Sequence, residues 1–156
     1  MVSDRIADVI IGKGKEFAHG FTYSGHPAAC VVATRNLEII EREGVVEQVR
    51  NETGPYLCQL WEHFIEHPLV GEVRTAGLLG ASELVDDKSS RRFFHDRGKV
   101  GERCRDLCVQ NGLVMRAVQD TMILSPPLVA TKGHLDEIYE KASKTFNQLA
   151  EELGRC

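Results

Sequence analysis

The spacing of apolar residues along the chain predicts a protein built mainly of helices. We expect helices at 3–11, 27–43, 46–67, 99–111 and 132–152. Apolar side chains recur at helical spacing in the third and fifth of these segments, and a possible cap with Pro27 predicts the start of the second. Gly54 and Pro55 lie inside the third segment and are expected to kink or split it, because proline lacks an N–H. The last segment has the clearest pattern, and we expect its apolar face to be buried.

Shorter apolar runs between these helices indicate strands. We expect strands at 71–85, 113–118 and 121–124, and an extended segment at 17–23. Gly77 and Gly80 interrupt the first run, which therefore predicts either one long bent strand or two short ones. Helices mixed with a few short strands predict an α+β fold, with a small antiparallel sheet covered on one face.

The composition narrows the class of protein without naming an activity. The chain has 156 residues, the length of one ordinary domain, and 19 basic against 23 acidic residues give a net charge of −4. A nucleic-acid partner is therefore not expected, and no apolar run approaches the ~20 residues of a membrane span. Five cysteines without a C-x-x-C pair favour a cytoplasmic protein, with Cys104 and Cys108 as buried thiols.

A glycine-flanked run of hydroxyl-bearing residues stands directly before the predicted helix at 27–43. Residues 20–27 read GFTYSGHP. The backbone N–H groups and positive dipole end of a helix attract phosphate, and the Thr22 hydroxyl could donate to it. The alternative is that Ser24 or Thr22 only caps the helix.

A single charged residue, Arg116, interrupts the otherwise apolar run at 113–118. Its guanidinium is permanently ionised and pairs best with a carboxylate, since two of its N–H groups match two oxygens. That carboxylate can belong to an Asp or Glu of the protein or to a substrate acid, and the sequence leaves both possibilities open.

Two further patterns suggest chemistry that we do not favour. His63, Glu66 and His67 match H-x-x-E-H, which on a continuous helix places two imidazoles one turn apart for zinc. Pro68 follows at once and no third ligand stands out, so an exposed helix end is favoured. Lys132 precedes a glycine, as many carbonyl-binding lysines do, but it begins an exposed amphipathic helix.

Four motifs, taken in order, resemble the C-terminal part of class III aminotransferases. They are GFTYSGHPAAC at 20–30, HPLVGEVR at 67–74, GLVMR at 112–116 and SPPL at 125–128. The likeness covers essentially the whole chain and is greatest for the ω-amino acid:pyruvate subgroup, although Thr75 replaces a glycine common there. It implies the type I fold of transferases that use pyridoxal phosphate (PLP), with a large-domain remnant and connecting helix at 1–43 and the C-terminal small domain at 44–156.

The resemblance also implies roles for individual residues. Thr22, with Phe21 in the same turn, would contact the PLP phosphate across a dimer interface, and Arg116 would bind the substrate carboxylate. The family's lysine that binds PLP belongs to a part of the large domain upstream of this sequence. We therefore expect a fragment that does not bind PLP covalently and has no turnover alone.

The function implied is a contribution to transferring an amino group from an ω-amino acid or amine to pyruvate or another 2-oxo acid. The expected partners are these small molecules and a second copy of the protein. Two alternatives stay open. One is a non-catalytic binding or regulatory module that pairs with a separate large-domain chain, and the other is a zinc hydrolase using His63, Glu66 and His67.

Overall fold

A computed structural model describes residues 3–14, 20 and 22–155 of the chain. The chain forms two compact units, with the boundary between Ile39 and Ile40. The division expected at residues 43 and 44, and its assignment to a large-domain remnant and a small domain, remains a prediction. No helix in the described part of the chain is both long enough and apolar enough to cross a bilayer.

The first unit contains helix α1 (Asp4–Gly12) and most of α2 (Pro27–Arg42), which confirms two expected helices. Pro27 is the first residue of α2, where its missing N–H leaves no hydrogen bond unmade. The extended segment expected at 17–23 is wrong where it is described. Thr22 and Tyr23 belong to a turn, which is closed by a 3.2 Å hydrogen bond from the His26 N–H to the Tyr23 carbonyl. Residues 17–19 and 21 lie outside the described residues.

The third predicted helix is continuous in space but changes its winding. It is made of α3 (Val45–Gln48), the π-helical turn η1 (Val49–Thr53), α4 (Gly54–Glu62) and the 3₁₀ turn η2 (His63–Glu66). The Gly54 N–H donates to the carbonyl of Val49, five residues back, so the expected break takes the form of a π turn just before Pro55. A Cβ at Gly54 would lie 3.2 Å from the Cα of Gly77. The glycine thus lets another segment approach closely.

That segment is the turn of a hairpin, the second of the two forms expected for 71–85. The sheet contains β1 (Val70–Ala76), β2 (Leu79–Leu84), β3 (Arg116–Val118) and β4 (Thr121–Leu124), in the order β1-β2-β4-β3. All neighbouring pairs are antiparallel, as predicted. The register places Arg74, Ala81, Ile123 and Arg116 in one row across the sheet, so these four side chains share a face.

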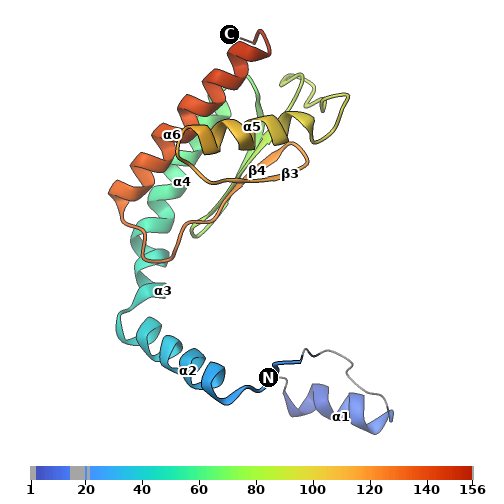
Figure 1. Cartoon of the computed structure of the whole chain (residues 1–156), viewed down its shortest axis with the longest axis vertical. Helices are drawn as coiled ribbons and strands as arrows, with labels where there is room; N and C mark the ends of the chain where they lie inside the picture. The colour runs from blue at the N-terminus through green and yellow to red at the C-terminus, as the bar shows by residue number, and fades with distance from the viewer. Residues whose placement is uncertain (1–2, 15–19, 21, 156) are drawn as a thin grey trace. The chain divides into compact units, whose positions relative to one another are not determined.

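Helices α4 and α5 (Lys99–Gln110) pack on the other face, and α6 (Lys132–Glu152) packs on these two helices, so that the three enclose the core of the second unit (Figure 1). Trp61, Leu107, Met122 and Phe146 are fully buried among them, and each such side chain contributes about 1.5–3 kcal/mol. Both Cys104 and Cys108 are buried in the same core, as expected. The sequence therefore predicted the fold class correctly: a small antiparallel sheet with flanking helices.

Candidate functional site

The Thr22 hydroxyl lies in an exposed turn, five residues before the first residue of α2. It has no hydrogen-bond partner among the described residues, so within that part of the chain it does not act as a helix cap. The first turn of α2 contains no acidic residue that would repel an anion. An exposed donor ahead of a 16-residue helix suits a phosphate group. Phe21, predicted to act in the same turn, lies outside the described residues.

Arg116 is the first residue of β3, at the edge of the sheet, and its side chain is exposed. The described residues supply no acidic side chain within ion-pairing distance of its guanidinium. Of the two possibilities left open by the sequence, the ion pair within the protein is therefore absent from the described part of the chain. The half-buried Ile123 lies directly opposite Arg116 on β4, so the two side chains start as neighbours on the same face of the sheet.

Two carboxylates on the same face of the sheet interact with arginines other than Arg116. Glu72 accepts a 2.7 Å hydrogen bond from Arg74 and lies 3.8 Å from Arg91. Glu83 lies 3.8 Å from Arg74. The Arg74 hydrogen bond lowers the pKa of Glu72, so this carboxyl stays charged and paired near neutral pH. Neither of these carboxylates therefore pairs with Arg116 in the described part of the chain.

The H-x-x-E-H histidines do not form a paired site. His63 lies in η2, where its Nδ1 is 3.3 Å from the carbonyl of Leu60. The backbone becomes extended at His67, whose Nδ1 accepts a 3.2 Å hydrogen bond from the Leu69 N–H. Among the residues that the structure describes, no three His, Cys, Asp or Glu side chains are grouped to hold a metal. The geometry thus does not support the zinc hydrolase alternative.

Lys132, the other candidate for carbonyl chemistry, is an exposed residue at the start of α6. Its ammonium lies 5.2 Å from the centre of the Tyr56 ring, a distance typical of a cation–π contact. This residue fits the surface position that the sequence favoured.

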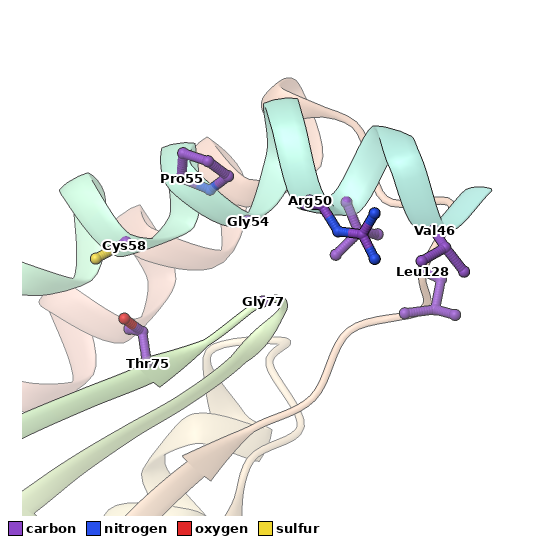
Figure 2. Close-up of a pocket in the computed structure, with 9 residues that line it drawn as sticks. Val46, Arg50, Gly54, Pro55, Cys58, Thr75, Gly77 and Leu128 are labelled. Carbon is purple, nitrogen blue, oxygen red and sulfur yellow. The ribbon is translucent and has the colours of Figure 1, made fainter. Parts of the chain in front are cut away.

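A cavity of about 510 Å³ lies between η1, the β1–β2 turn and the segment that follows β4 (Figure 2). Most of its lining is apolar, and Thr75 points into it from β1 towards α4. Thr75 is the position at which the resemblance expects glycine. Arg116 faces the opposite side of the sheet from Thr75, so this cavity is separate from the candidate carboxylate site.

The fold agrees with that of the proteins to which the chain is similar. A family model described as aminotransferase class-III matches residues 1–146. The chain is 49% identical, over 96% of its length, to putrescine–pyruvate aminotransferase of Pseudomonas aeruginosa, and covers 32% of that protein. It is 38% identical over 98% of its length to gamma aminobutyrate transaminase 1 of Solanum lycopersicum, and covers 31% of it.

Solved structures of aminotransferases also match this chain. The ω-transaminase of Pseudomonas jessenii in complex with PMP superposes with a TM-score of 0.83 and 37% identity, over 96% of this chain and 33% of that one. A PMP-bound aminotransferase from Vibrio fluvialis gives a TM-score of 0.82 and 34% identity, over 96% and 33%. The chain belongs to the class III aminotransferase family, and it spans about a third of the length of the relatives it matches.

One buried residue next to the strand of Arg116 was not identified from the sequence. Asp120 lies between the two strands expected at 113–118 and 121–124, and its side chain is buried and hydrogen-bonded to the start of α5. The sequence contains only an indirect sign that Asp120 caps α5. Gly98 precedes α5 and offers no side chain to cap it, so a cap has to come from another part of the chain.

Proposed function

We propose that this chain contributes a cofactor contact and a substrate contact to a PLP-dependent class III aminotransferase. Thr22 binds the phosphate of PLP, and Arg116 binds the carboxylate of a 2-oxo acid that accepts the amino group. The observation that carries this proposal is that Arg116 is exposed and has no acidic partner among the described residues, in a chain that belongs to this family. PLP, when bound, supplies an electron sink for removing a proton from the amino-bearing carbon.

The described turn around Thr22 fits the phosphate in charge and in hydrogen bonding. Its hydroxyl is exposed, and the dipole of α2 has its positive end at Pro27. Phosphate offers only acceptor oxygens, so a rotatable O–H donor suits it. We further propose, from the resemblance, that Thr22 contacts PLP held by a second copy of the protein.

Arg116 would bind and orient the acceptor. Two guanidinium N–H groups can hold both oxygens of a carboxylate, which fixes the direction of the adjoining 2-oxo group. A charge-assisted hydrogen bond contributes about 1.5–3 kcal/mol, which corresponds to roughly 10- to 150-fold in binding. We propose pyruvate as acceptor and an aliphatic amine as donor, supported by the name of the putrescine–pyruvate relative.

The test is a hybrid enzyme in which this chain replaces the matching third of the Pseudomonas aeruginosa relative. In the hybrid, Arg116→Leu should raise the KM for pyruvate about 10- to 100-fold, while turnover of a carboxylate-free aldehyde changes less than twofold. Thr22→Val should increase the loss of PLP on dialysis. Arg105→Leu, which removes another exposed arginine, serves as the control. An unchanged KM for pyruvate in Arg116→Leu would contradict the assignment.

A further inference from the structure

We infer that Asp120 is a positioning residue for Arg116. Its carboxylate fastens the β3–β4 turn to the start of α5 and so fixes the edge strand from which Arg116 projects. The inference rests on the proposed function of Arg116. Its structural part, the fastening of β3, can be tested separately.

Both oxygens of the Asp120 carboxylate are used. Oδ2 accepts a 2.9 Å hydrogen bond from the Gly98 N–H, and Oδ1 accepts one of 2.9 Å from the Gly101 N–H. The residue is only 2% exposed, so few water molecules compete for these bonds. A negative charge at this end of α5 also interacts favourably with the helix dipole. Asp120 therefore caps α5 from a distant part of the sequence, because Gly98 cannot.

The turn and the helix also touch through their backbones. A Cβ added to Gly101 would lie 1.9 Å from the carbonyl oxygen of Gln119, so only glycine permits this approach. The Gln119 side chain accepts a 2.9 Å hydrogen bond from Arg97, in the segment before α5. On the other side of the turn, the Asp120 carbonyl accepts a 2.9 Å bond from the Leu84 N–H of β2. The turn is thus held by α5 and the sheet together.

β3 depends on this attachment because it has little other support. It is three residues long, and β4 is its single neighbour in the described sheet. Val118, its last residue, leads directly into Gln119 and Asp120, while Arg116 is its first. An edge strand this short is expected to separate from β4 when its turn is released. The guanidinium would then lose the fixed position that carboxylate binding requires.

The first test uses the whole 156-residue chain, labelled with ¹⁵N, and follows amide hydrogen exchange by NMR. Asp120→Asn replaces one acceptor oxygen by an NH₂ group that cannot accept from an N–H. Exchange at Gly98, Gly101 and Val118 should become at least tenfold faster. Asp106→Asn, at an exposed position of α5, is the matched control and should leave these rates within twofold. Unchanged exchange at Val118 in Asp120→Asn would overturn the inference.

The second test uses the hybrid enzyme described above. Asp120→Asn should raise the KM for pyruvate at least fivefold while kcat/KM for a carboxylate-free aldehyde stays within twofold, a split that general loss of stability would not produce. If exchange at β3 accelerates but the KM for pyruvate is unchanged, Asp120 does not position Arg116. If Arg116→Leu is also without effect, the proposed role of Arg116 fails as well. Should Asp120→Asn not fold, Asp120→Ser retains one acceptor and takes its place.

Discussion

The two arginines on the open face of the sheet, Arg74 and Arg116, have different surroundings. Arg74 bonds to Glu72, which raises the pKa of its guanidinium, and it lies near Glu83. Such exposed ion pairs contribute about 0–1 kcal/mol, so the pair mainly fixes side-chain positions. Arg116 carries the same charge in the same row of residues, without an acidic partner among the described residues. The difference in partners, rather than in charge, makes Arg116 the candidate for binding.

We expect the stability of the second unit to depend on pH through His67. Burial lowers the pKa of His67 from 6.5, assisted by the charge of Lys88 and partly opposed by the side chain of Asn147. The folded protein thus favours the neutral ring, whose Nδ1 accepts from the Leu69 N–H. The resulting stability is complete above pH 6.5 and is lost as the pH falls through the folded-state pKa. Urea unfolding at pH 7.5 and 5.5 should show a smaller free energy at the lower pH.

The variant His67→Gln separates this effect from other titrations. Glutamine keeps a side-chain oxygen that can accept a hydrogen bond but has no proton to gain in this range. Its free energy of unfolding should therefore fall less between pH 7.5 and 5.5 than that of the unmodified chain. Equal pH dependence in the two proteins would show that His67 does not contribute.

At the scale of helices and strands, the sequence predicted regular elements well and contacts between elements poorly. Both boundaries of the helix Lys132–Glu152 were predicted correctly, because its apolar positions repeat without interruption. The π turn before Gly54 was expected only as a break, since its form depends on how Gly77 approaches from the hairpin. Arg116 was identified because a charge in an apolar strand is visible in sequence. Asp120 was not, because its partners are about 20 positions away.

The contact between η1 and the β1–β2 turn leads to a prediction about Gly54. A Cβ there would lie 2.5 Å from the Val49 carbonyl oxygen and 3.2 Å from the Gly77 Cα, and neither backbone atom can move aside easily. Gly54→Ala should lower the free energy of unfolding by about 1–3 kcal/mol, measured by urea denaturation. Gly133→Ala, in the first turn of α6, should not lower it, because a Cβ there would make only an ordinary contact, 3.9 Å from the Thr131 hydroxyl oxygen. Equal effects of the two substitutions would refute this account of the close approach.

On the scale of the whole molecule, the two units differ in how much apolar surface they bury. The second unit has a continuous core around Trp61 and Phe146. In the first unit, neither α1 nor α2 contains a buried residue among those described. Val31, Val32 and Leu37 on α2 are each at least 66% exposed. A helix that exposes large apolar side chains in this way favours association with another surface.

We therefore expect the isolated chain to self-associate through α2. Sedimentation velocity between about 5 and 100 µM should show a concentration-dependent rise in the average sedimentation coefficient, because association buries apolar surface at about 25 cal/mol per Å². The double variant Val32→Glu and Leu37→Lys leaves the net charge unchanged and should abolish this rise. Thr34→Glu combined with Asn36→Lys is the matched control on the same helix, since it makes the same charge change at exposed polar positions. A chain that sediments as a monomer throughout, or a control pair that dissociates it equally, would contradict association through the apolar side chains of α2.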